Sequence, residues 1–280
     1  VNESPLADLA GDVFAHWQLG GDLATDIALR LDLGEGAAPP EVRVSTRFSD
    51  VDLDIRPGGL AVRAISGVLD YDTRTGFSSR DLAGQLWGQA LQVSVGQAEA
   101  ATPAQAGAAA GAGAAGEGPA VSVAMQTTVA MADLGQWLGV EQAGFAEGQT
   151  ALNLELRAAA GAAPVLSIDS TLAGVSLDLP APWDKAADTL RPLHLELALG
   201  RDSVLLDIAV ADTLAAELEL VEGQLRAASV GLGSEPLVLQ PGQVRVSGRT
   251  ALLDTSQWQD FLAAHVALAR APAQQGKQGP

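Results

Sequence analysis

Alternation of apolar and polar residues dominates this chain of 280 residues. Successive side chains of a β-strand point to opposite faces, so a period of two predicts strands with one apolar and one polar face. The clearest apolar series are Ile27, Leu29 and Leu31; Val42 and Val44; Leu53 and Ile55; Leu152, Leu154 and Leu156; Leu166 and Ile168; Leu177 and Leu179; Leu193, Leu195, Leu197 and Leu199; and Leu206 and Ile208. The sequence therefore predicts a protein of the all-β class, built mainly from strands.

Helical spacing is confined to two short segments, near 133–140 and 254–269. The second has a clear beginning, because Asp254 or either of the two residues after it can cap a helix whose apolar stripe includes Trp258 and Phe261. Short Gly- and Pro-containing segments separate many of the strands, which predicts antiparallel neighbours.

The parity of the alternation changes at two places, between Phe48 and Val51 and between Leu172 and Val175. A continuous strand can absorb such a shift only through a bulge, and otherwise the chain must turn. Gly174 suits the second shift, and the pair at 20–21 is typical of a turn.

Between residues 96 and 120 the alternation stops and the chain consists almost entirely of Ala, Gly, Pro and Gln. Such a composition is typical of a flexible insertion. We expect an N-terminal β segment at 1–95 and a C-terminal β segment at 121–280, both belonging to one continuous sheet, with a short helix and a disordered tail at the end.

Composition excludes several classes of function. The 16 Lys and Arg against 34 Asp and Glu give a formal charge of -18, which opposes binding to nucleic acid. The absence of Cys excludes disulfides, thiolate catalysis and cysteine-ligated metals. No uninterrupted apolar run is long enough to span a bilayer as a helix.

Residues 111–116 match the G-x-G-x-x-G pattern of dinucleotide sites, but they lie in the Ala/Gly tract without the strand, helix and acidic residue that such a site needs. No phosphate-binding P-loop occurs either. We therefore expect neither a nucleotide nor another cofactor.

Carboxylates recur on short spacings. Asp70, Asp72 and Asp81 have part of the spacing of a calcium loop, but Arg74 and Thr75 occupy positions that such a loop needs for a ligand and a glycine, so a hairpin turn ending at Gly76 is the better interpretation.

Asp50, Asp52 and Asp54 share one side of a strand, which is typical of a solvated face. His16, His194 and His265 lack zinc-binding spacing. We expect no catalytic and no metal site, although an enzyme using Asp52 and Asp54 remains a third hypothesis.

The apolar faces of so many strands need a cover, which leaves three architectures: a two-layer sandwich, a closed barrel, or an open groove covered by something other than protein. Aromatic residues make up only 4%, so Leu, Val and Ala would form a smooth lining that suits acyl chains. A structural or adhesive β-sandwich of an envelope protein stays open as the alternative.

Three stretches add a family resemblance. Residues 59–95 contain an isG-x-L-x-y pattern followed by a G-x-x-l-x-v strand, residues 174–199 contain the phrase LP-x-P-x-x-K, and residues 248–262 contain a strand, an aspartate and a tryptophan-bearing helix. A weaker echo lies at 129–138. Together they resemble the YhdP family of the AsmA-like superfamily.

The resemblance implies a long curved antiparallel sheet with an open hydrophobic groove. It also implies the periplasmic part of an inner-membrane-anchored protein of a Gram-negative bacterium, which moves phospholipid toward the outer membrane. The expected partners are phospholipid acyl chains, with the inner- and outer-membrane surfaces reached through other parts of the chain. The apolar series given above are the expected lining of the groove.

Overall fold

A computed structural model describes residues 17–33, 40–55, 60–97, 120–137, 144–159, 163–199, 203–221, 224–233, 236–250 and 254–269. The strands are β1 (Trp17–Arg30), β2 (Glu41–Ile55), β3 (Leu60–Asp72), β4 (Gly76–Leu86), β5 (Gln89–Gln97), β6 (Ala120–Ala130), β7 (Ala146–Ala159), β8 (Val165–Ser170), β9 (Val175–Leu177), β10 (Leu193–Leu199), β11 (Ser203–Val210), β12 (Leu214–Val221), β13 (Gln224–Leu232) and β14 (Val244–Gly248). The helices are α3 (Met131–Trp137) and α4 (Thr255–Ala269).

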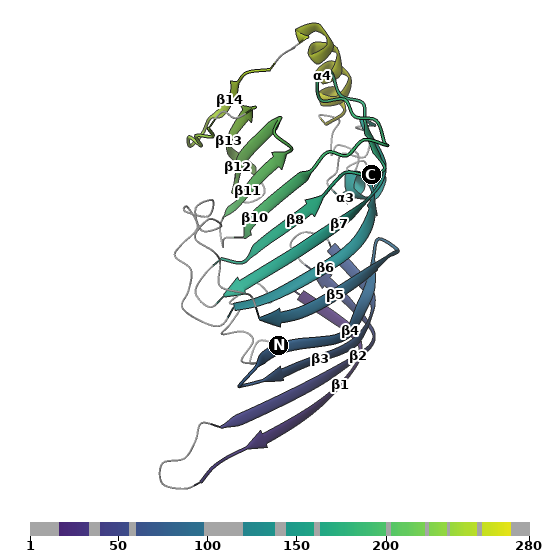
Figure 1. Cartoon of the computed structure of the whole chain (residues 1–280), viewed down its shortest axis with the longest axis vertical. Helices are drawn as coiled ribbons and strands as arrows, with labels where there is room; N and C mark the ends of the chain where they lie inside the picture. The colour runs from purple at the N-terminus through teal and green to yellow at the C-terminus, as the bar shows by residue number, and fades with distance from the viewer. Residues whose placement is uncertain are drawn as a thin grey trace, which may run out of the picture.

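The strands form one open sheet that follows chain order from β1 to β14, with the short β9 paired to β7 beside the main path. Neighbours are antiparallel except for β13 and β14, which run parallel. Figure 1 shows the strands following one another along the length of the molecule. The mainly β, largely antiparallel open sheet and the two short helices are confirmed.

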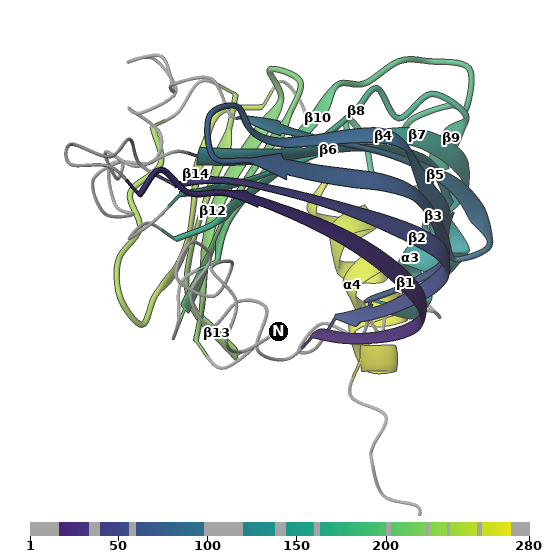
Figure 2. The same cartoon turned by 90° about the horizontal axis from the view of Figure 1, so that it is seen from below.

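The sheet is strongly curved, and its strands bend around an open interior (Figure 2). The connection between β13 and β14 runs along the outer side of this curve (Figure 2), and there the Val238 N–H donates to Ser229 Oγ, 3.1 Å away. Ser229 pairs with Glu217 and Arg245, so its side chain belongs to the polar side of the sheet. The opposite, apolar side is therefore the concave one.

Irregularities bend the N-terminal strands. The parity shift between Phe48 and Val51 is a bulge, as expected, with Asp50 at φ 54°. Gly21, at φ 112°, produces a register shift inside β1. The prediction of a turn at 20–21 is therefore wrong, because a glycine with positive φ serves a bulge as well as a turn. Between β3 and β4, Gly67 and Asp81 mark a similar irregularity.

The second predicted parity shift is a turn. The chain leaves β8 at Ser170, passes Leu172 and Gly174, both at positive φ, and enters β9 at Val175. Ser170 Oγ accepts the Leu172 N–H and contacts Thr150 Oγ1, which closes this turn with buried hydroxyls.

Both helices lie along one long side of the sheet, called here the helical rim, together with β9 and the segment 178–192. Asp254 caps α4, since its Oδ1 accepts the N–H groups of Ser256 and Gln257. Trp258 and Phe261 of α4 make edge contacts with Trp183 and Phe145, at centroid distances of 5.4 and 6.0 Å. This aromatic cluster fastens α4 to the rim.

β5 and β6 pair directly, from Gln97 opposite Val121 to Leu91 opposite Thr127. The strands on either side of the Ala/Gly-rich stretch are thus neighbours in one sheet. Most of that stretch, including the G-x-G-x-x-G match at 111–116, lies outside the described residues, as do His16 and the end of the segment 133–140.

Candidate functional site

The concave side carries an apolar surface that crosses the whole sheet. Directly paired residues share a face, so the register traces this surface from strand to strand. One row of paired members on β1–β4 is Ile27, Val44, Tyr71 and Phe77. A second row starts at Leu82 of β4 and continues on β5–β8 and β10–β14 through Val93, Met125, Leu154, Ile168, Leu195, Ile208, Ala216, Val230 and Val246. We call this surface the apolar face.

The register places most of the expected lining residues on this face. Paired neighbours include Leu29 and Val42, Leu53 and Leu19, Leu156 and Leu166, Leu197 and Leu206, and Leu199 and Val204; Leu152 lies opposite Thr127, Leu193 opposite Val210, and Ile55 opposite Trp17. Leu31 continues β1 beyond its last pair. Leu177 and Leu179 lie apart, on β9 and just after it at the helical rim.

Sequence reasoning missed the middle of the face. Leu69, Tyr71, Phe77, Leu91 and Val93 belong to it through their register pairs. The bulges at Asp50, Ala64 and Asp81, all at positive φ, interrupt the alternation in β2–β4, so parity alone could not be followed there. The regular alternation of Leu91, Val93 and Val95 was the signal that could have extended the lining.

The apolar face is only partly covered. In the central strands Leu154, Ile168, Leu195 and Ile208 are half-buried by their neighbours, whereas Ile27 on the edge strand β1 is 71% exposed. Full burial occurs toward the helical rim, at Val129 and Thr150. The described strands form a single layer, so the two-layer sandwich kept as an alternative is not their arrangement.

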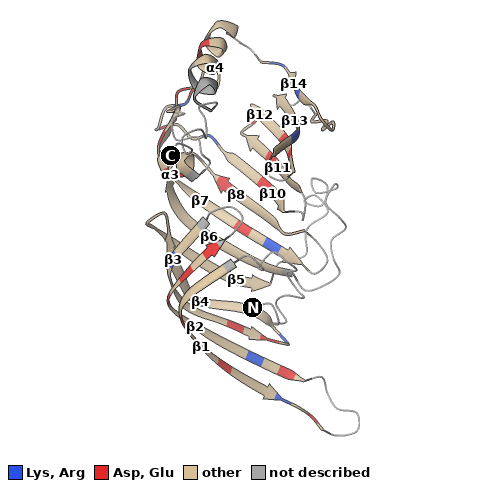
Figure 3. Cartoon of the chain, turned by 180° about the vertical axis from the view of Figure 1, so that it is seen from behind, with Lys and Arg blue, Asp and Glu red and all other residues tan. Residues whose placement is uncertain are grey.

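The convex, polar face carries ion pairs both across and along its strands. Asp70 accepts hydrogen bonds from Ser45 and Arg80, which lower the pKa of its carboxyl. Figure 3 shows acidic and basic positions spread over the strands. Glu155 contacts Arg157 at 2.8 Å, and this pairing lowers the pKa of Glu155. These contacts keep the outer side of the sheet hydrated.

The expected solvated carboxylates are paired on this polar face. Arg63 Nη2 donates to Asp54 Oδ1 at 2.8 Å, and Arg63 lies 3.8 Å from Asp52. Asp72 ends β3 and accepts the Arg74 N–H at 2.8 Å in a hairpin turn that leads to Gly76. Within the described ranges, no three His, Asp or Glu side chains are placed to hold a metal ion.

His194 is paired through Nδ1 with Asp169 Oδ1 at 2.7 Å. His265 lies on α4, and its side chain is outside the described part of the structure.

The motif LP-x-P-x-x-K, at residues 179–185, forms a hydrogen-bonded loop at the helical rim. Lys185 is 5% exposed, and its Nζ donates to the carbonyl oxygens of Val175 and Ala186 at 2.6 and 3.1 Å. Burial lowers the pKa of Lys185, and the positive charge of Arg191 adds to this effect. Leu177 and Lys185 also exchange backbone hydrogen bonds, so the lysine ties the segment after β9 back onto that strand.

A family model described as YhdP protein matches residues 1–280. The chain belongs to the YhdP family. No curated protein and no solved structure matches it. YhdP proteins are envelope proteins without a known catalytic role. No described helix of this YhdP protein has the length and apolar character needed to span a bilayer.

Proposed function

We propose that the apolar face of this YhdP protein holds the acyl chains of phospholipids, and that the sheet is a periplasmic segment of a path along which lipids move between the inner and outer membranes. The observation that carries this proposal is the continuity of the apolar face from β1 to β14 on the concave side of a single-layer sheet. A solvent-exposed apolar surface of this extent indicates a site that binds a partner.

Energetics explain why such a surface would be useful. Moving a chain of about 16 carbons into water costs about 12 kcal/mol at roughly 0.8 kcal/mol per CH₂, so lipids do not cross an aqueous gap unaided at a useful rate. Side chains such as Leu154, Ile168, Leu195 and Ile208 offer the tails an apolar surface instead. These aliphatic side chains offer no polar groups for specific recognition, which favours weak, repeated contacts and therefore sliding.

The test compares two adjacent residues of β10. Leu197 lies between Leu166 and Leu206 on the apolar face, whereas Ala198 lies between Val165 and Leu205 on the polar face. We expect Leu197→Asp to reduce the phospholipid that co-purifies with the protein by about tenfold, because a carboxylate would be desolvated beneath the tails. Ala198→Asp introduces the same charge and should leave bound lipid unchanged.

Native mass spectrometry of the purified protein measures the bound lipid directly. Wild-type protein free of phospholipid would contradict the proposal. Equal lipid loading of both variants would contradict it too, because the apolar face would then have no special role in binding.

A further inference from the structure

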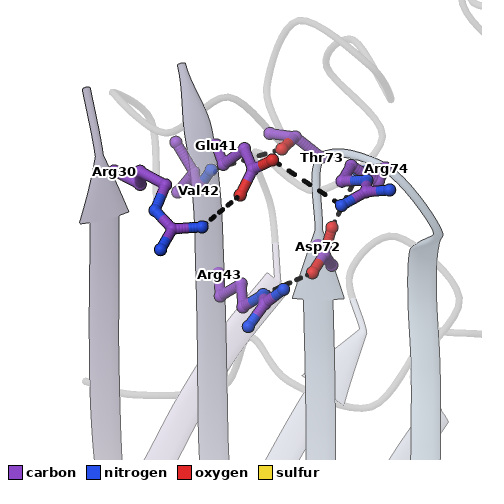
Figure 4. A network of polar contacts seen from close by, with 7 residues as sticks. All are labelled: Arg30, Glu41, Val42, Arg43, Asp72, Thr73 and Arg74. Carbon is purple, nitrogen blue, oxygen red and sulfur yellow. Dashed lines mark hydrogen bonds and ion pairs between the residues drawn. The ribbon is translucent and has the colours of Figure 1, made fainter. Parts of the chain in front are cut away.

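An arginine-rich cluster lies where β1 ends and β2 begins, on the long side of the sheet opposite the helical rim. It comprises Arg30, Glu41, Arg43, Asp72 and Arg74 (Figure 4) and is called here the arginine cluster. Arg43 Nε donates to Asp72 Oδ2 at 2.7 Å. Arg30 and Arg74 both approach the carboxylate of Glu41, at 3.8 and 3.7 Å.

The cluster has an excess of positive charge in an otherwise acidic chain. Three guanidinium groups face two carboxylates, while the whole chain carries a formal charge of -18. Charge-assisted hydrogen bonds of arginine are about 2.7–2.9 Å long, so the contacts of Arg30 and Arg74 with Glu41 are loose. Within the described part of the chain, neither guanidinium has a closer ion-pair partner.

The apolar face begins on the other side of the same strand ends, because consecutive residues of a strand point to opposite faces and Arg30, Arg43 and Asp72 belong to the polar side. Leu29 precedes Arg30 and pairs with Val42, and both belong to the apolar face. Tyr71, the single tyrosine of the chain, precedes Asp72 on β3 and packs against Phe77 at a centroid distance of 4.8 Å. Aliphatic side chains and an aromatic ring with a hydroxyl on the concave side, and arginines on the convex side, thus meet at this edge of the sheet. Proteins use this order of side chains where they meet the head groups and tails of lipids.

We infer that the arginine cluster binds the phosphate of a phospholipid whose acyl chains lie on the adjoining part of the apolar face; this inference rests on the proposed function. Arg30 is at the last position of β1, and its side chain is 84% exposed, which lets the guanidinium reach a phosphate at the strand end. Arg74 reaches the same place from the turn between β3 and β4.

Glu41 and Asp72 set the strength of this site. They neutralise two of the three positive charges, so a single excess charge attracts the phosphate. A site with this balance binds weakly and is sensitive to salt. Weak binding suits a lipid that must leave again. The position of the arginines keeps its head group at the edge opposite the helical rim, with its tails on the concave side.

The test uses a double variant, Arg30→Gln with Arg74→Gln. The matched control is Arg245→Gln in β14, because this exposed arginine lies at the other end of the sheet, where no member of the cluster is found. The probes are dihexanoyl phosphatidylglycerol, dihexanoylglycerol, which has the same tails without phosphate, and inorganic phosphate. Isothermal titration calorimetry at low salt gives Kd, and far-UV circular dichroism checks that the variants fold.

We expect the double variant to raise the Kd for phosphatidylglycerol by about five- to tenfold, as the loss of two weakly paired charges implies. The Kd for dihexanoylglycerol should stay unchanged in every variant, and Arg245→Gln should change neither value. Inorganic phosphate should bind much more weakly than phosphatidylglycerol.

Three results would overturn the inference. An unchanged Kd for phosphatidylglycerol in the double variant shows that the arginines do not contact the head group. An equal loss for dihexanoylglycerol shows a structural effect, and tight binding of inorganic phosphate alone shows a free-anion site. Provided that wild-type protein still binds dihexanoylglycerol, each of these results leaves the proposed function supported. Failure of both lipids to bind wild-type protein contradicts both proposals.

Discussion

Asp207 is flanked by carboxylates on both neighbouring strands. It lies opposite Glu196 of β10 and Glu217 of β12 on the polar face. Burial raises the pKa of Asp207, and the negative charges of Glu217 and Glu196 raise it further. The folded protein therefore holds a proton on this carboxyl at a pH where an unfolded chain has released it.

The raised pKa gives a prediction for stability. Because the folded state binds this proton more tightly, stability falls as pH rises from about 3.8 through the raised pKa of Asp207. Replacing Asp207 with Asn should therefore stabilise the protein at pH 7, by about 0.5–1 kcal/mol as judged from like charges on paired strands. Urea unfolding at pH 7 and at pH 3.5 measures the difference, which should shrink at the lower pH.

Asp212→Asn is the control for this prediction, since Asp212 lies exposed in the turn between β11 and β12. A stabilisation of equal size in this variant would show that lowering the total negative charge is sufficient. A gain for Asp207→Asn that persists at pH 3.5 would also contradict the explanation, because protonation should already have removed the repulsion.

Single residues also show where sequence reasoning reaches its limit. The phrase around Lys185 could be recognised from its letters, but the role of its ammonium group could not. Its hydrogen-bond acceptors are backbone carbonyls, one of them ten residues earlier at Val175. Every residue carries such a carbonyl, so only the folded path of the chain identifies this acceptor.

Bulges determine how the N-terminal strands bend. A Cβ atom at Gly21 would lie 2.6 Å from the carbonyl oxygen of Asp50, and one at Gly67 would lie 2.5 Å from the carbonyl oxygen of Asp81. Both glycines also have positive φ, at 112° and 128°. Each one thus allows a close approach of two strands that any other residue would prevent.

Two adjacent glycines of β1 allow a matched test of this point. Gly21→Ala should destabilise the pairing of β1 with β2 by about 2 kcal/mol, through the clash with Asp50 and an unfavourable φ. Gly20→Ala should have a much smaller effect, because a Cβ there meets open space. Hydrogen exchange of the β1 amides measures both. Equal protection in the two variants would contradict the importance of the bulge.

The elements differ in how well the sequence predicts them. Alternation located strands such as β1, β2, β7, β10 and β11, but the series given above included none of β3–β6. The apolar parity located the bulge after Phe48 correctly. The glycines at 20 and 21 were misinterpreted because local sequence does not distinguish a bulge from a turn. Deciding between them requires the partner strand, here β2 with Asp50, which is distant in sequence.

The candidate lining shows the same limit. Regular strands such as β10 and β11 could be assigned a face from their alternation, but the strands with bulges could not, because each bulge reverses the assignment. The arginine cluster could not be predicted at all. Its members come from three strands and a turn, and only register brings Arg30 beside Glu41.

As a whole, the described strands form a single layer, so one face of the sheet is not packed against a second layer of protein. A compact protein of the same length packs both faces of its sheets or helices. Unfolding the described part of this chain therefore exposes less new apolar surface than unfolding a compact protein does.

This difference predicts a shallow unfolding transition. The urea m-value scales with the area exposed on unfolding, so it should be lower than the value for a compact protein of the same length. Urea titrations at several protein concentrations measure it and detect association. An m-value typical of a compact protein, independent of concentration, would show that the apolar face is covered within the monomer.

The parallel pairing of β13 with β14 decides where the chain goes next. With antiparallel neighbours only, connections would alternate from one long side to the other, and a final strand of five residues would deliver the chain about 17 Å away from the helices. Because β14 repeats the direction of β13, both strands finish on the same side. This one reversal of the back-and-forth order brings Trp258 within reach of Trp183, so the docking of the last helix depends on a connection made before that helix begins.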